Sequence, residues 1–318
     1  MRKNLNSCRV EGYVYDRSKL VSRETGPTSK TPGTQYISGD LDIAVDEEGL
    51  NVVAVHFTYV TEHYASGKPN NTYNALVKVM EAENASWLEA GKENAMNVRV
   101  DGGLGVNDFI GRDGNMVAAK RCEGSFLNIV STLNPKESER STFQEDIVIT
   151  KVNRIEANEE RNIAEDYVVL RGAVFNFRND LAPVDLVVRN PQGMNYFESL
   201  DVSASEPLYT KVWGHIVSQT IQITRTEESA FGDSAVRAFE RKNREWVVTG
   251  TAKYPYDYGE EDVMTEEELK TAVQNREVHL AEVKKRNDEY LAKNTAPAAT
   301  KAKTADMSIK KTKADFNF

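Results

Sequence analysis

The titratable side chains that could support catalysis are few and scattered along the chain. His56 and His63 lie seven residues apart, across a predicted strand end and a loop, and do not have the spacing of metal ligands. The two cysteines, Cys8 and Cys122, are too few for a disulfide framework or a Cys-rich metal site. We therefore expect no metal and no cofactor. The four histidines are His56, His63, His215 and His279.

Two other patterns do not complete a catalytic or phosphate-binding site. Asp101–Gly105 is rich in glycine, but it lacks the lysine and the strand-to-helix context of a phosphate-binding loop. The acidic run Asp46–Glu48 falls in a predicted turn, where carboxylates are most simply solvated. The sequence therefore predicts a protein that is not an enzyme.

Aromatic side chains at alternating positions indicate a binding function instead. Residues 6–15 alternate between small or apolar side chains and charged or aromatic ones, which predicts a half-buried strand. Tyr13 and Tyr15 share its outward face, where they could stack against bases. Gly12 indicates a bend, a bulge or a close backbone approach. The alternative is an ordinary sandwich strand with tyrosines at its rim.

A flexible basic loop is expected next to this strand. Residues 17–35 are rich in Ser, Thr, Gly and Pro and carry four basic residues against one acidic residue. Proteins that bind single strands combine such positive charge with exposed aromatic side chains. Phe57, Phe126 and Phe177 are expected in the core. The candidate nucleic-acid-binding residues are Tyr13, Tyr15, Arg17, Lys19, Arg23, Lys30, Tyr36, Tyr59, Lys120, Arg121, Phe175, Arg178, Lys211 and Trp213.

Composition sets the limits of these predictions. The chain has 318 residues, 40% of them hydrophobic, and a net charge of −9. An acidic total does not exclude a polyanionic ligand, because a local basic groove is what attracts one. No apolar run is long enough to span a membrane, and the N-terminus lacks the apolar core of a signal peptide. With few cysteines, a cytoplasmic protein is expected, in the host cytoplasm if the source is viral.

Periodicity predicts a mainly β first unit. A helix over residues 72–83 is expected between the third and fourth of five strands, an arrangement that fits a five-stranded barrel with long loops. The predicted strands are 6–15, 36–45, 51–60, 96–104 and 116–130.

Several short motifs in this unit resemble single-stranded DNA-binding proteins of the bacterial and phage-type OB-fold class. Asn6-x3-Val10-x-Gly12-x-Val14 is similar to the first strand of that family, and Asp42–Val45 to the end of its second strand. Trp87–Lys92 and Val98–Leu104 are similar to its lysine/glycine turn and the strand that follows. The chain's end, Asp315–Phe318, resembles the family's partner-recruiting tip.

The resemblance implies an N-terminal OB-fold barrel that coats single-stranded DNA without sequence preference, in replication, recombination or repair. It also implies that Asp315, Phe316 and Phe318 recruit partner proteins, and a homo-oligomer is possible. The family tip follows acidic residues, whereas lysines precede it here, so the partner is expected to differ from the family's. The rival interpretation is a structural β-sandwich virion or assembly protein that does not bind nucleic acid.

The remainder of the chain predicts a second β-rich, OB-like unit, a long helix and a disordered tail. Thr265 and Glu268 have the spacing of a capping box that opens the helix. In the second unit we expect strands over 142–152, 168–177, 185–189, 194–202, 209–217, 219–225 and 245–254, and a late helix over 235–242. The predicted divisions are 1–135, 136–259, 260–293 and 294–318.

Overall fold

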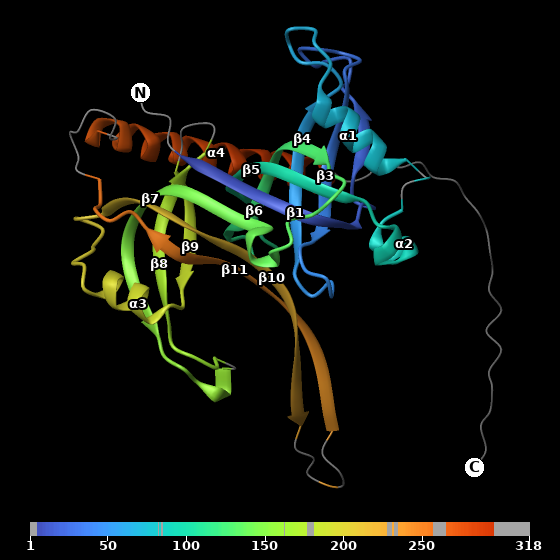
Figure 1. Cartoon of the computed structure of the whole chain (residues 1–318). Helices are drawn as coiled ribbons and strands as arrows, with labels where there is room; N and C mark the ends of the chain where they lie inside the picture. The colour runs from blue at the N-terminus through green and yellow to red at the C-terminus, as the bar shows by residue number, and fades with distance from the viewer. Residues whose placement is uncertain are drawn as a thin grey trace, which may run out of the picture.

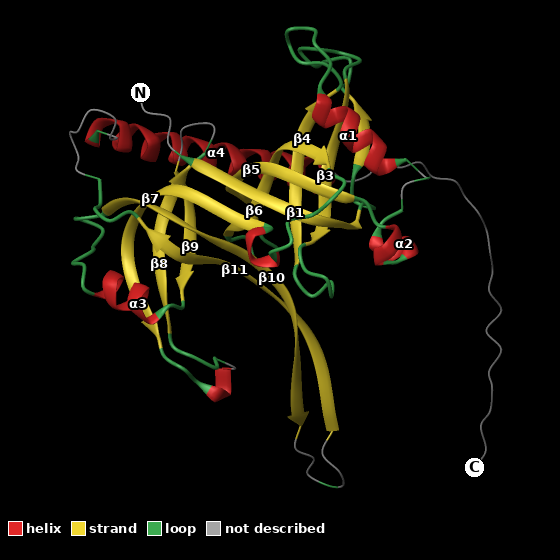
Figure 2. Cartoon of the chain, viewed as in Figure 1, coloured by secondary structure: helices red, strands yellow, loops and turns green. Residues whose placement is uncertain are grey.

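The computed structural model describes residues 5–81, 83, 85–161, 163–176, 181–227, 231, 235–256 and 265–295. Within these residues the chain is mainly β, as predicted: 11 strands belong to one hydrogen-bonded sheet, and a long helix follows them near the C-terminus (Figures 1 and 2). Of the predicted tail, residues 294–318, the first two residues belong to this helix, and residues 296–318 lie outside the described residues, as do Phe177 and Arg178.

The first five long strands form a closed cycle, which we call the first unit. β1 pairs antiparallel with both β3 and β5. β3 in turn pairs antiparallel with β4, and β5 pairs antiparallel with β6. A short parallel pairing of β4 with β6 completes the cycle. Helix α1 (Asn71–Met80) lies between the third and fourth of these strands in the chain, as predicted, and β2 (Val21–Glu24) adds to the edge of β3. The strands are β1 (Asn6–Asp16), β3 (Gln35–Ala44), β4 (Val52–Thr61), β5 (Asn97–Ile110) and β6 (Met116–Ile129).

The next five strands repeat this connectivity and form the second unit. β7 pairs antiparallel with β8 and β10, β8 with β9, and β10 with β11, while β9 and β11 close the cycle with a parallel pairing. Helix α3 (Pro191–Glu198) again lies between the third and fourth strands. The strands are β7 (Ser141–Ile155), β8 (Tyr167–Phe175), β9 (Leu181–Val188), β10 (Leu208–Glu227) and β11 (Ala235–Thr251).

Two bulge glycines occupy equivalent positions in the two units. Gly102 of β5 stands opposite Cys8, and Gly214 of β10 stands opposite Phe143; the register shifts at both glycines. A Cβ at either position would lie 1.9 Å from a carbonyl oxygen of the neighbouring strand, so only glycine fits. Counting two residues along the first strand of each unit makes Val10 the counterpart of Glu145.

Two secondary-structure predictions in the second unit were wrong. Residues 194–202 were expected as a strand, but α3 covers most of them; Asn190 caps it and Pro191 opens it, an arrangement typical of helix N-termini. Residues 235–242 were expected as a helix, but they belong to β11, because pairing with β10 over the whole length of the hairpin overrides local helix propensity.

The core explains the alternation in β1. Val10 and Val14 are buried, and Gly12 makes the predicted close approach, since a Cβ there would lie 2.0 Å from the Ala44 carbonyl oxygen. Phe57 is fully buried, as expected. Phe126 was expected in the core too, but its side chain is 59% exposed on β6.

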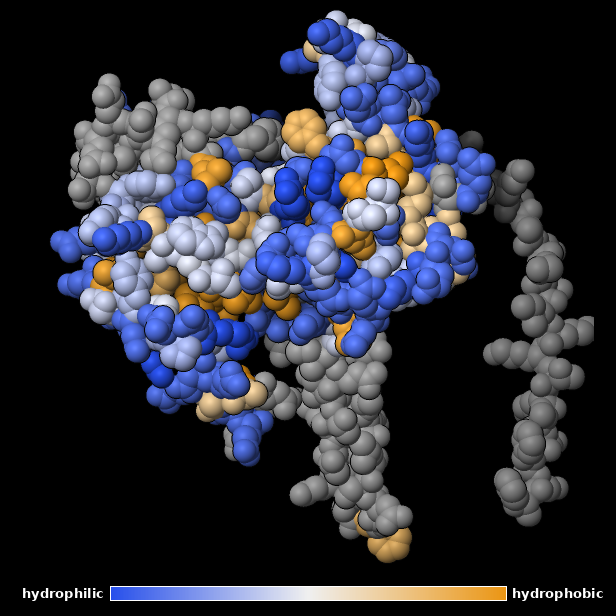
Figure 3. Space-filling view, in the orientation of Figure 1, coloured by the Kyte–Doolittle hydropathy of each residue, from blue (hydrophilic) through white to orange (hydrophobic). Residues whose placement is uncertain are grey.

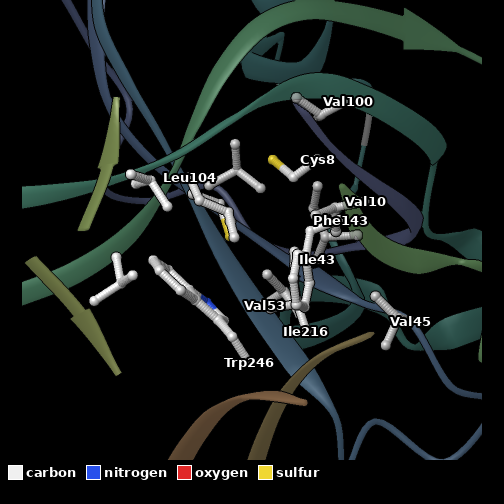
Figure 4. Packing of buried hydrophobic residues seen from close by; sticks show 14 of the residues in the cluster. Cys8, Val10, Ile43, Val45, Val53, Val100, Leu104, Phe143, Ile216 and Trp246 are labelled. Carbon is white, nitrogen blue, oxygen red and sulfur yellow. The ribbon is translucent and has the colours of Figure 1, made fainter. Parts of the chain in front are cut away.

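The two units share one hydrophobic core and exchange hairpins. β1 pairs with β7, and Ile216 and Trp246 of the second unit pack in the same cluster as Ile43 and Val53 of the first (Figure 4). The β10–β11 hairpin reaches the first unit, where the Ser218 backbone N–H donates to the side-chain oxygen of Asn51. The β5–β6 hairpin reaches β9 in return, where the Lys120 amine donates to the Asp185 carbonyl oxygen.

Helix α4 (Glu266–Thr295) runs across both units (Figure 1). The predicted capping box is present, with Thr265 and Glu268 bonding reciprocally. Leu269 and Ala272 pack against the second unit, and Arg276 bonds to Asp108 on β5 of the first. The remaining short elements are α2 (Trp87–Ala90) and the 3₁₀ turns Lys92–Asn94, Glu137–Glu139 and Glu159–Arg161.

Candidate nucleic-acid interface

A basic cleft lies where the outer face of the first unit meets the β10–β11 hairpin. It has a volume of about 320 Å³ and is lined by residues of β3, β4, β5, β6, β10 and β11 and by Lys19 in the loop before β2. Of the described residues that line this cleft, Asp40 alone carries a carboxylate. We call the cleft the basic cleft. Its lining includes the cationic residues Lys19, Lys120, Arg121 and Arg244 and the imidazole of His56.

Acidic neighbours orient most of these groups. The Lys19 amine lies 2.7 Å from Asp42, and this hydrogen bond raises the pKa of the lysine. His56 Nδ1 lies 2.7 Å from Asp40, and that contact lowers the pKa of the carboxyl. The Lys19 side chain is still 51% exposed, and Arg244 is exposed on the opposite wall. Both cations are therefore within reach of an anionic ligand.

Lys120 and Arg121 are held more tightly. Lys120 is mostly buried, with its amine 5.4 Å from the centre of the Trp246 ring, and burial lowers its pKa. Arg121 donates to Glu123 of the same strand, at 2.9 Å. Lys120 on the first unit therefore mainly makes contacts to the second unit. The guanidinium of Arg121 remains partly exposed.

Tyr36 and Tyr59 form an aromatic pair on the same outer face. Their ring centres are 4.5 Å apart at an angle of 45°, and Tyr59 is 47% exposed. Tyr36 and Asp40 point to the same side of β3, about 13 Å apart along the strand, at ~3.3 Å per residue. An exposed stacking surface and a cationic cleft therefore lie on one face of β3 and β4.

The other basic residues predicted near the N-terminus have different surroundings. Arg17 donates to the carbonyls of Val79 and Glu81 at the end of α1 and pairs with Glu89, so its side chain is mostly buried in structural contacts. Arg23 and Lys30 are exposed, on β2 and the loop after it. These two remain available to a ligand, whereas Arg17 is committed to holding the helix.

Tyr13 and Tyr15 are not an open stacking platform in this structure. Both tyrosine rings contact Trp87 of α2, with centres 5.5 and 5.9 Å away. The Tyr13 hydroxyl donates to Glu47, which also accepts from Lys92 and Arg140. These bonds lower the pKa of Glu47 to about 2. The cluster packs α2 against β1 and covers part of both tyrosine rings.

The candidates from the second unit do not converge on the cleft. Phe175 is 3% exposed and packs against Tyr209, so a base cannot reach its ring. Trp213 is partly exposed and lies over Gly250, on strands β10 and β11, while Lys211 is half-buried on β10. Arg178 and the predicted tip residues Asp315, Phe316 and Phe318 lie outside the described residues.

Sequence reasoning missed Arg244 and gave His56 no role in binding. Arg244 follows a segment that was expected to be helical, so its position on a strand facing the first unit was not foreseen. The available signal was the two-residue spacing of Trp246 and Val248, which is typical of the buried face of a strand and would include Arg244 if the strand began earlier. His56 stood out only as a poor metal candidate.

Two further features of the described part of the chain concern metal-ligand groups and membrane-spanning helices. Its residues include no group of three or more His, Cys, Asp or Glu side chains that could hold a metal ion. None of its helices is long and apolar enough to cross a membrane. The face drawn in Figure 3 is largely hydrophilic, with hydrophobic side chains in small separate groups.

Comparisons with known proteins show a family and a remote structural likeness. A family model described as YorF matches residues 5–286. No curated protein matches the chain. Among solved structures, a deletion mutant of the single-stranded DNA-binding protein from Thermus aquaticus is 11% identical, with 81% of this chain and 98% of that chain covered and a TM-score of 0.46. A likeness at this level is too remote to carry a conclusion about function.

Proposed function

The chain belongs to the YorF family, and we propose that it binds single-stranded DNA without strong sequence preference. The observation that carries the proposal is the basic cleft beside the Tyr36–Tyr59 pair, on one face of β3 and β4. Phosphates would bind Lys19, Arg121 and Arg244, and a base would stack on Tyr59. Stacking requires an open base face, which a single strand offers and a duplex does not.

The connectivity supports this placement. We propose that each five-stranded cycle is an OB-type barrel, a fold whose second and third strands and neighbouring loops bind oligonucleotides. In the first unit those strands are β3 and β4, and the loop between the first and second strands of the cycle carries Lys19 and β2. The cationic and aromatic side chains therefore lie where such a barrel would bind its ligand.

The biological setting is a further part of the proposal. We place the protein in DNA replication, recombination or repair, without catalytic activity, in the cytoplasm, with the Asp315–Phe318 tip recruiting other proteins. A variant that lacks these four residues should bind oligo-dT within about threefold of wild type and lose its replication or repair partners in a pull-down. If every partner is retained, the tip has no recruiting role.

Fluorescence anisotropy with labelled oligo-dT and a duplex of equal length, at two salt concentrations, tests the binding itself. We expect oligo-dT to bind more tightly than duplex, with affinity falling as salt rises because each phosphate contact releases counterions. Arg244→Glu should weaken oligo-dT binding at least tenfold, whereas Lys136→Glu, an exposed lysine outside the cleft, should not. Equal affinity of Arg244→Glu and wild type, or no binding by wild type, would favour the structural assembly protein.

A further inference from the structure

A second cleft lies between the β5–β6 hairpin and helix α4. It has a volume of about 440 Å³, and we call it the α4 cleft. Asn107 and Arg121 line both this cleft and the basic cleft, so the two hollows meet at the hairpin. The side chains with binding chemistry in the α4 cleft are Asn107, Phe109, Arg121, Glu123, Arg286 and Asn287.

A buried ion pair holds α4 against the hairpin. Arg276 donates to both carboxylate oxygens of Asp108, at 2.6 and 2.5 Å, and His279 lies 3.2 Å from the same carboxylate. The Asp108 side chain is 2% exposed, so its carboxylate interacts with Arg276 and His279 and not with a ligand. This bidentate contact fixes α4 against the β5–β6 hairpin. Arg286 lies ten residues further along the same helix, so its position beside the hairpin is fixed as well.

The exposed groups of the α4 cleft match the parts of a nucleotide. Phe109 is 41% exposed and offers an apolar ring for a base. Arg286 is exposed on the helix side, and Arg121 lies on the hairpin side, where phosphates could be bound from both walls. Asn107 and Asn287 add neutral donors and acceptors. The acidic residues of the lining are Glu123, which accepts from Arg121, and Asp108, which accepts from Arg276.

We propose that a single strand lying in the basic cleft continues over the β5–β6 hairpin into the α4 cleft, where a base stacks on Phe109 and a phosphate binds Arg286. The inference rests on the proposed function and extends it: the C-terminal helix is a wall of the DNA-binding groove, and the bound strand is longer than one cleft holds. Arg121, common to both clefts, contacts the strand where it crosses the hairpin.

Two variants with matched controls test this path. Phe109→Ala removes the stacking ring, and Phe126→Ala removes a more exposed phenylalanine that lines neither cleft. Arg286→Ala removes the helix cation, and Lys285→Ala removes the adjacent cation, which does not line the cleft. Affinity is measured with oligo-dT of about 5 and about 16 nucleotides, since an OB fold covers ~4–16. Circular dichroism confirms that each variant keeps its fold and helix content.

We expect Phe109→Ala to weaken binding of the longer oligonucleotide by about five- to hundredfold while the shorter one changes less than about twofold. Arg286→Ala should lower the slope of log affinity against log salt by about 0.7 for the longer oligonucleotide, and Lys285→Ala should leave it unchanged. If wild type and Arg244→Glu differ but Phe109→Ala and Arg286→Ala behave like their controls, this inference fails and the proposed function stands. If wild type does not bind, both fail.

Discussion

The two β-units have the same strand order and differ in what lies on their outer surfaces. On the first unit, β3 and β4 carry an exposed tyrosine and face a cleft with cations from both units. On the second unit, the end of β8 is covered: Phe175 is buried under α4, in one cluster with Leu269 and Ala272. Connectivity therefore does not by itself make a binding surface, and the placement of α4 and of the hairpins decides which unit stays open.

A second difference lies in the strands that join the units. Val10 in β1 is buried opposite Val100, whereas its counterpart Glu145 in β7 is buried opposite Val212. Among the described residues, neither carboxylate oxygen of Glu145 has a hydrogen-bond partner, and burial raises the pKa of this carboxyl to about 8. At equivalent buried positions, the first unit thus has an aliphatic side chain, Val10, and the second unit has a carboxylic acid, Glu145.

The largest effect we predict is on the free energy of unfolding, when Glu145 of the second unit is replaced by valine, the residue type at the equivalent position 10 of the first unit. Because the folded pKa of Glu145, about 8, is above its ordinary value of 4.5, the fold favours the protonated acid, and stability falls as pH rises from 4.5 to about 8. At ~1.4 kcal/mol per pKa unit the loss is a few kcal/mol. Glu145→Val should remove this loss and raise the free energy of unfolding most above pH 8.

Urea unfolding at several pH values measures this effect. Glu156→Val, a change at an exposed glutamate, is the control and should leave the pH profile as in wild type. If Glu145→Val is destabilised by the same amount at every pH, Glu145 has a structural partner that we have not identified and the comparison with Val10 is wrong.

The next effect compares exposed tyrosines on the two units. Tyr59→Ala should weaken oligo-dT binding by about tenfold, within the ~1–3 kcal/mol of one stacked base. Tyr254 is more exposed than Tyr59 and lies near Lys253 in the second unit, so a tyrosine and a cation are present there too. Tyr254→Ala should nevertheless change the affinity by less than about twofold. Equal losses in anisotropy titrations would show that the second unit also stacks bases.

The smallest predicted effect is the contribution of Glu47 to stability, which depends on pH in the opposite direction to that of Glu145. The pKa of Glu47 is held at about 2, below its ordinary 4.5, first by Lys92 and then by Arg140 and Tyr13, so its contribution is present above pH 4.5 and is lost as pH falls towards 2. Because the side chain is 40% exposed, solvent screening limits the effect to about 1 kcal/mol. Thermal melts of Glu47→Gln should therefore differ from wild type at pH 7 and converge with it in acid. Parallel profiles at all pH values would contradict this assignment.

Local patterns in the sequence were sufficient for much of the fold. The alternation around Val10 and the helical spacing in residues 72–83 gave correct elements, because each repeats over a stretch that contains its own signal. Residues 235–242 could not be assigned this way, since their strand depends on pairing with β10. The same reason hid the α3 helix, although Asn190 and Pro191 were a visible start signal.

The candidate site was less predictable than the fold. Lys19, Lys120 and Arg121 were named from charge and position, but Arg244 joins them only because the β10–β11 hairpin crosses to the other unit. Tyr13 and Tyr15 had the expected outward spacing, yet Trp87, more than seventy residues later, covers them. Outward position on a strand is a local property, whereas openness to a ligand depends on distant segments.

The most direct test of the central claim is the salt dependence of oligo-dT binding by two double variants. Lys19→Ala with Arg244→Ala removes two cations of the basic cleft, and Lys151→Ala with Arg171→Ala removes two exposed cations from β7 and β8 of the second unit. We predict that the first pair lowers the slope of log affinity against log salt by about 1.4, at ~0.7 per phosphate contact, and that the second pair leaves it unchanged. Equal slopes for the two variants, or a larger change in the second, would contradict the assignment of single-strand binding to the basic cleft.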